Sequence, residues 1–145
     1  MAKQTYFEDV EVGSEIAPLE KDPTTQQLVK YAGASGDFYQ IHYDKDFALA
    51  NKLPGVILHG ALKNAFLGQL MTDFAGEQGW VRKLSVQYRG MDQPASKVIC
   101  RGKVTKKYTD AGRPAVDCEI WLENAKGEKT TPGSATVYLP TRAAH

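Results

Sequence analysis

Asp37 and His42 stand five positions apart, in a stretch of small and polar residues that is typical of a loop. A carboxylate and an imidazole brought together can take up and release protons near neutral pH. Further along the chain, His59 and Gly60 open a long apolar segment that predicts a helix. The free N–H groups at the start of a helix favour negative charge, such as that on a polarised carbonyl oxygen. We therefore expect an enzyme that moves protons beside a carbonyl group.

Two helices are expected on either side of this loop. The first begins where Thr24 or Thr25 can act as N-cap, and the glycine- and serine-containing stretch 33–36 breaks it. The second is short and runs from Asp44, its expected N-cap, to Lys52. The loop that carries the acid and the imidazole would thus be held between two helix ends.

A third helix is expected from about Gly60 to Phe74. It is apolar nearly all round, so other parts of the chain should surround it. Near the N-terminus, residues 6–16 are interpreted as a short strand or turn that ends at Gly13.

The second half of the chain alternates between apolar and polar residues, the period of half-buried antiparallel strands. Strands are predicted in four segments, 84–88, 98–104, 116–122 and 134–139. Turn-rich stretches predict hairpins between them, at 93–96, 110–112 and 124–127. Pro132 and Gly133 predict a bulge or a sheet edge in the last strand. A long apolar helix followed by these strands predicts an α+β fold, with a curled antiparallel sheet around the helix.

The composition limits the classes of function. A chain of 145 residues with 42% hydrophobic residues can bury a core of its own, so we expect a single domain over residues 1–145. The net charge of +1 gives no basic field, which argues against nucleic acid as a partner. The first six residues lack the apolar run of a signal peptide, and no window has the length of a membrane span. These features favour a cytoplasmic protein that does not enter membranes.

Cys100 and Cys118 fall on the apolar side of strand-like segments. This placement predicts buried free thiols, and neither residue has the cationic or helix-start surroundings of a nucleophile.

The chain resembles the MaoC-like branch of the hot-dog fold, which contains the (R)-specific enoyl-CoA hydratases and (3R)-hydroxyacyl-thioester dehydratases. The resemblance rests on Ala-Ser-Gly-Asp at 34–37, Ile-His-Tyr-Asp at 41–44 and His-Gly at 59–60. The strand that ends with Val-Gln-Tyr-Arg at 86–89 also stands where the family has its long strand after the central helix.

The resemblance implies a hydro-lyase of fatty acid metabolism. Water would add reversibly, in the syn sense, to a trans-2-enoyl thioester of coenzyme A or of an acyl carrier protein, giving the (R)-3-hydroxyacyl thioester. Asp37 is then the principal acid/base group, and His42 orients the water and shares the proton transfer. The backbone N–H of Gly60 holds the thioester oxygen. Neither a metal nor a cofactor beyond the coenzyme A of the substrate is implied, and the partner is a second hot-dog subunit, in a homodimer or a heterodimer.

The chain departs from the family pattern at two places. Tyr39 and Gln40 stand where Asn-Pro is common, and Gly68 stands where many members carry a serine on the central helix. These departures keep open a non-catalytic or partner-dependent acyl-thioester-binding subunit. A hot-dog thioesterase is the other alternative, although the Asp37–His42 loop ahead of the central helix weighs against it.

Each candidate residue also has a purely structural interpretation. Asp37 is compatible with a turn residue and His42 with a brace for the loop, whereas Asp44 is expected to cap the short helix. His42 and Asp44 together have metal-ligand types, but a third convincing ligand is missing. The ring of His59 is expected to bond to the backbone near the helix start.

A run of basic residues follows the first two strands of the predicted sheet. Its members are Arg82, Lys83, Arg89, Lys97, Arg101, Lys103, Lys106 and Lys107. Most are expected to form a solvated face, and a subset is a candidate for binding the phosphates of coenzyme A or the acidic surface of a carrier protein.

Overall fold

The computed structural model describes residues 3–142. The predictions for the first six residues and for one domain over residues 1–145 therefore fall partly outside the described residues. The elements in chain order, with η for a 3₁₀ turn, are η1 (Phe7–Asp9), β1 (Glu15–Lys21), α1 (Thr25–Ser35), η2 (Gln40–His42), α2 (Lys45–Ala50), α3 (Gly60–Ala75), β2 (Trp80–Val86), β3 (Val98–Asp110), β4 (Arg113–Glu123) and β5 (Lys129–Tyr138).

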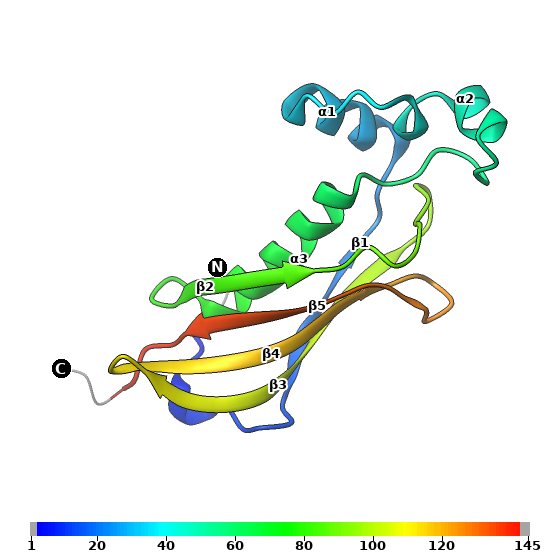
Figure 1. Ribbon diagram of the computed structural model, residues 1–145. Helices are drawn as coiled ribbons and strands as arrows, with labels where there is room; N and C mark the ends of the chain where they lie inside the picture. Colours follow the sequence, from blue (N-terminus) through cyan, green and yellow to red (C-terminus); the bar gives the residue numbers. More distant parts are fainter. Residues whose placement is uncertain (1–2, 143–145) are drawn as a thin grey trace.

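The sheet has the strand order β1-β3-β4-β5-β2, and all neighbouring strands are antiparallel. It curves around α3, which lies along one of its faces (Figure 1). Strands β2 and β1 form the two edges of the sheet. The predicted α+β fold, with a curled antiparallel sheet wrapped around a long central helix, is confirmed.

The core lies between α3 and the inner face of the sheet. Leu67 and Met71 of α3 are fully buried, as are Val116 and Ile120 of β4. The strand residues alternate between the buried inner face and the outer face, as the period-two pattern predicted. Burial of this apolar surface is the main force that holds the helix in the sheet.

Helices α1 and α2 lie beyond the end of the sheet, near the N-terminus of α3 (Figure 1). Thr24 caps α1, because its side chain accepts a hydrogen bond of 3.1 Å from Gln27 N. Gly33 and Ser35 lie within α1 and do not break it. Gly36 ends the helix, in the left-handed conformation (φ 77°) that glycine adopts without steric cost.

The N-terminal prediction was wrong in its bounds. A 3₁₀ turn occupies Phe7–Asp9, and the first strand begins only at Glu15, beyond Gly13. The pairing of β1 with β3 shifts register between Ile16 and Leu19. This irregularity interrupts the alternation of side chains, which is the signal that identifies a strand in a sequence.

The hairpin predicted at 93–96 was also wrong. Strand β2 pairs with β5, whereas β3 pairs with β1 and β4, so this segment crosses from one edge of the sheet to the other side. The two other predicted hairpins are confirmed, since β3 pairs with β4 and β4 with β5.

Of the two alternatives predicted for the last strand, the edge is wrong, because β5 lies between β4 and β2. A pairing irregularity does occur in β5, but at Thr130, two residues before Pro132, because Leu122 pairs with Thr131 and Glu123 with Lys129. A Cβ on Gly133 would collide with the carbonyl oxygen of Ser85. Glycine at this position therefore allows the close approach of β2 to β5.

Within residues 3–142, no helix has both the length and the apolar character needed to cross a membrane.

Candidate active site

His42 is fixed at the end of η2 and is almost completely buried. Its Nδ1 lies 2.7 Å from the carbonyl oxygen of Ile57. A carbonyl can only accept, so Nδ1 carries a proton and Nε2 of the neutral ring is an acceptor. The Ile57 N–H in turn donates to the carbonyl of Ile41, at 3.1 Å. These two hydrogen bonds fix the imidazole against the segment that leads into α3.

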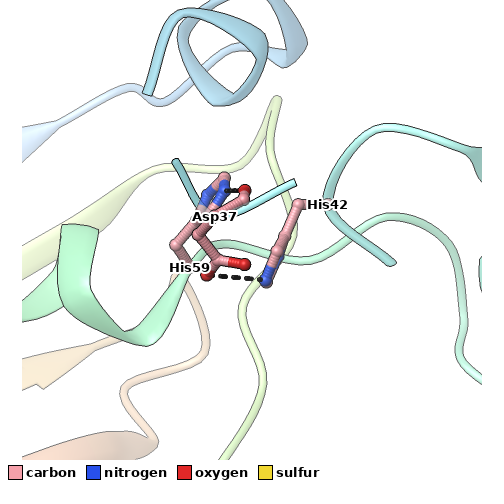
Figure 2. A group of neighbouring side chains, drawn as sticks. All are labelled: Asp37, His42 and His59. Carbon is pink, nitrogen blue, oxygen red and sulfur yellow. Dashed lines mark hydrogen bonds and ion pairs between the residues drawn. The ribbon is translucent and has the colours of Figure 1, made fainter. Parts of the chain in front are cut away.

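Asp37 follows the glycine that ends α1, and local hydrogen bonds fold its loop back. Its N–H donates to Oγ of Ser35 at 3.2 Å, and its Oδ1 accepts from Tyr39 N at 3.3 Å. The second oxygen, Oδ2, lies 3.8 Å from His42 Nε2. The carboxylate side chain is 48% exposed, whereas the imidazole is 7% exposed. Figure 2 shows the carboxylate turned toward the His42 ring.

Asp37 Oδ2 and His42 Nε2 are both hydrogen-bond acceptors. Their separation of 3.8 Å is short enough for one water to donate to both, since each such hydrogen bond spans about 2.8 Å. A water held in this way has both protons directed at bases and its lone pairs free to attack.

His59 lies behind this pair and is fully buried. Its ring stacks on that of His42, with ring centroids 3.8 Å apart and an interplanar angle of 20°. Its Nε2 donates to the main-chain oxygen of Asp37 at 3.2 Å, the second contact drawn in Figure 2. The predicted bond from His59 to the backbone exists, but its acceptor belongs to the Asp37 loop and not to the helix start. His59 thereby ties the acid-bearing loop to α3.

Burial and the neighbouring His42 lower the pKa of His59 below its usual value. The ring therefore stays neutral around pH 7. A neutral ring is consistent with one nitrogen that donates to Asp37 O and another, Nδ1, that has no hydrogen-bond partner among the described residues.

Gly60 is the first residue of α3. The side chain of His59, the N-cap residue, does not cap the helix, so the first N–H groups open outward from it. The ring of Tyr88 packs against Gly60: a Cβ added there would lie 3.0–3.2 Å from the end of the ring.

A pocket of about 360 Å³ lies beside His42 and Gly60. It is lined by Ile41, His42, Ile57, Leu58, Gly60, Lys63, Tyr88, Arg89, Gly90 and Met91. The volume is within the range of small-molecule sites. A larger cavity of about 500 Å³ lies between β1 and the C-terminal half of α3, and none of the predicted site residues lines it. The structure thus brings His42 and Gly60 into one pocket, with Asp37 beside His42.

The metal-ligand pair considered from the sequence is not formed. Asp44 caps α2, with its Oδ1 accepting from Phe47 N at 3.0 Å. The residues that do gather are Asp37, His42 and His59, whose potential ligand atoms lie within 4.8 Å of one another. The stacked imidazoles argue against a shared ion, because their in-plane lone pairs lie in nearly parallel planes and do not converge.

Two residues that line the pocket, Lys63 and Tyr88, were not predicted as site residues from the sequence. Lys63 is buried on α3, and its Nζ bonds to the carbonyl of Gly90 at 2.9 Å and to Oδ2 of Asp92 at 3.0 Å. Tyr88 had been assigned only to a strand. The sole available signal was a lysine within an apolar helix, which is unusual because lysine is seldom buried without a partner.

Of the residues that depart from the family pattern, Tyr39 lies beside His42. Tyr39 is 55% exposed, and its ring meets that of His42 edge-on at 6.3 Å. A Cβ on Gly68 would meet no described atom within 4 Å, so packing does not require glycine there.

The predicted basic run does not form one surface. Strands β2 and β3, which carry it, are separated in the sheet by β4 and β5. Lys97 forms an ion pair with Glu20, and Arg101 forms one with Glu123.

The sequence of residues 9–119, well over half of the chain, matches the family described as MaoC like domain. The chain belongs to the MaoC-like domain family. This membership supports a hydratase or dehydratase at the level of the family. No curated protein sequence matches the chain.

Several solved structures share its fold. The (R)-hydratase from A. caviae involved in PHA biosynthesis has a TM-score of 0.81 and 23% identity, over 90% of this chain and 98% of that one. R-Hydratase PhaJ1 from Pseudomonas aeruginosa has a TM-score of 0.84 and 20% identity, over 94% of this chain and 86% of that one. The ChsH1–ChsH2 complex from Mycobacterium tuberculosis has a TM-score of 0.78 and 19% identity, over 89% of this chain and 98% of that one. These likenesses confirm the predicted hot-dog fold.

Proposed function

We propose that the protein is an acyl-thioester hydratase/dehydratase. It adds water reversibly to a trans-2-enoyl thioester and gives the (R)-3-hydroxyacyl thioester. The observation that carries the proposal is the separation of 3.8 Å between Asp37 Oδ2 and His42 Nε2, at a pocket that also contains the N-terminus of α3. Membership of the MaoC-like family supports the same class of reaction.

In the hydration direction, the water held between Asp37 and His42 attacks the β-carbon of the enoyl group. A C–O bond forms, and the water proton passes to Asp37, with His42 holding the water in line. The electron pair of the double bond moves toward the α-carbon and the thioester oxygen. The α-carbon then takes a proton from Asp37, so that one water has been added in total. A positioned acid/base group of this kind typically contributes on the order of 10²- to 10⁴-fold to the rate.

The Gly60 N–H stabilises the negative charge that develops on the thioester oxygen. The positive end of the α3 dipole adds to this effect. Such stabilisation acts only as charge appears, so it lowers the barrier more than it strengthens substrate binding.

The reaction uses side chains and one backbone N–H, and it needs no metal and no cofactor other than the carrier part of the substrate. That carrier is coenzyme A or an acyl carrier protein. A second hot-dog subunit, identical or divergent, would complete the walls of the acyl pocket, which one chain leaves open.

The test is the loss of the ultraviolet absorbance of the conjugated enoyl thioester, with crotonyl-CoA and then with longer enoyl-CoAs. Asp37→Asn should lower the turnover rate at least 10²-fold, because the amide side chain cannot act as a base. Asp73→Asn is the matched control, since Asp73 lies on α3 away from this pocket and beside the other cavity. Circular dichroism checks that both variants fold.

Free thiol is measured in the same reactions. Thiol release that matches the loss of absorbance would indicate a thioesterase. Turnover by Asp37→Asn at the wild-type rate would refute the acid/base role. A wild-type protein without turnover, alone and with candidate partner subunits, would leave a non-catalytic subunit as the function.

A further inference from the structure

Tyr88 lies against Gly60, whose N–H holds the thioester oxygen in the proposed reaction. The three ring atoms nearest to the added Cβ on Gly60 are Cζ and the two Cε atoms, at 3.0–3.2 Å. The three distances are nearly equal, so the hydroxyl-bearing half of the ring covers Gly60 with its face. The phenol hydroxyl is attached to Cζ and therefore lies close to the first residue of α3, at the pocket that Tyr88, Gly60 and His42 line.

The hydroxyl of Tyr88 is also free to act as a donor. None of the hydrogen bonds among residues 3–142 engages it, although other tyrosine hydroxyls, such as those of Tyr108 and Tyr138, donate to carboxylates. Partial burial, together with the nearby Tyr31, raises the pKa of Tyr88 above its usual value. The phenol consequently keeps its proton at neutral pH.

The segment that carries Tyr88 is held firmly in place. The N–H groups of Arg89 and Gly90 both donate to the carbonyl of Thr130, at 2.9 Å. The Lys63 ammonium bonds to the Gly90 carbonyl and lies 5.9 Å from the centre of the Tyr88 ring. A donor that is positioned before the reaction costs no reorganisation when charge develops.

We propose that Tyr88 is a catalytic residue, whose hydroxyl donates a second hydrogen bond to the thioester oxygen beside that of the Gly60 N–H. This inference rests on the proposed function and deepens it. The two donors approach the oxygen from different elements, the N-terminus of α3 and the segment after β2. Together they stabilise the enolate that forms when water adds to the β-carbon or when a proton leaves the α-carbon.

The test variant is Tyr88→Phe, which keeps the ring against Gly60 and removes only the hydroxyl. We expect kcat for crotonyl-CoA to fall on the order of 10²-fold, with KM nearly unchanged, as for other enzymes that lose one donor to an oxyanion. Tyr108→Phe is the control, since its hydroxyl bonds to Asp117 between β3 and β4. It should keep wild-type kinetics.

A second readout does not depend on turnover. Acetoacetyl-CoA forms an enolate that absorbs in the ultraviolet and shares its negative charge between the 3-keto oxygen and the same thioester oxygen. The wild type should raise the enolate absorbance of the bound ligand, and Tyr88→Phe should raise it much less at equal occupancy. A variant that only changed packing would alter occupancy and not the enolate fraction.

Two results would overturn the inference in distinguishable ways. If the wild type turns over enoyl thioesters and Tyr88→Phe matches it in kcat and in enolate absorbance, Tyr88 is only a pocket wall and the hydratase proposal stands. If the wild type shows neither turnover nor enolate absorbance with any thioester, the hydratase proposal fails and this inference fails with it.

Discussion

The pairing of Asp37 with His42 could be predicted because both residues lie in one loop. A glycine that ends α1 and a short 3₁₀ turn bring side chains five positions apart to 3.8 Å. Local sequence contains the signals for such turns. Tyr88 and Lys63 reach the same pocket from distant parts of the chain, and no local pattern indicates that convergence.

The stacked imidazoles lead to a prediction about pH. The pKa of His59 is lowered in the folded protein, so the unfolded chain binds a proton at this residue more readily below its usual pKa of 6.5. Stability is therefore fully present above pH 6.5 and decreases as the pH falls below it. Urea unfolding midpoints at pH 7.5 and 5.5 should show this decrease in the wild type and a smaller one in His59→Phe. Equal decreases in the two proteins would contradict the prediction.

The two cysteines should be unreactive in the folded protein. Burial raises the pKa of both Cys100 and Cys118 to about 12. Since the thiolate is the reactive form, almost none is present at pH 8. Ellman's reagent should label neither thiol in native protein and both in guanidinium chloride. Rapid labelling of native protein would show that one of the strands opens easily.

At the scale of elements, the sequence predicted what is periodic and missed what is irregular or long-range. Helix α3 and strands β3, β4 and β5 have regular apolar spacing, and the sequence predicted all four, although β3 ends six residues later and β5 begins five residues earlier than predicted. Strand β1 was misplaced because a register shift interrupts its pattern. The sequence predicted a hairpin at 93–96, where the chain in fact crosses the sheet between β2 and β3. A turn-rich stretch does not show whether the strands on either side of it pair with each other.

A buried ion pair joins α3 to the segment that follows β2. Lys63 and Asp92 have side chains only 3% and 1% exposed, and Thr130 of β5 donates to the same carboxylate oxygen at 2.7 Å. Lys63→Met leaves that carboxylate buried without its cation. We expect it to lower the free energy of unfolding by about 3–5 kcal/mol, measured by urea denaturation.

The control for Lys63→Met is Lys97→Met, which breaks an exposed ion pair with Glu20 and should leave the free energy of unfolding nearly unchanged. The double variant Lys63→Met/Asp92→Leu should regain most of the lost stability, because an apolar pair needs no compensating charge. If the double variant is as unstable as Lys63→Met alone, the loss comes from packing and not from the unpaired carboxylate.

At the scale of the whole molecule, one chain leaves apolar surface uncovered near the site. Several large apolar side chains on α1, on α2 and around the pocket are more than two-fifths exposed, namely Val29, Phe38, Tyr39, Tyr43, Leu49, Tyr88 and Met91. Strand β2 also offers one unpaired edge. Exposed patches of this kind mark surfaces that bind another protein.

We therefore predict that the active species contains two hot-dog chains. In sedimentation experiments the purified protein, alone or with a divergent hot-dog partner, should run as a two-chain particle. Its specific activity toward enoyl thioesters should fall on dilution in step with the fraction of dimer. Mixing wild-type chains with an excess of Asp37→Asn chains tests whether each site draws its acid and imidazole from a single chain. The contact of 3.8 Å within one chain requires this arrangement, and activity should then follow the number of wild-type chains. A monomer with undiminished activity at every dilution would show that one chain closes its own pocket.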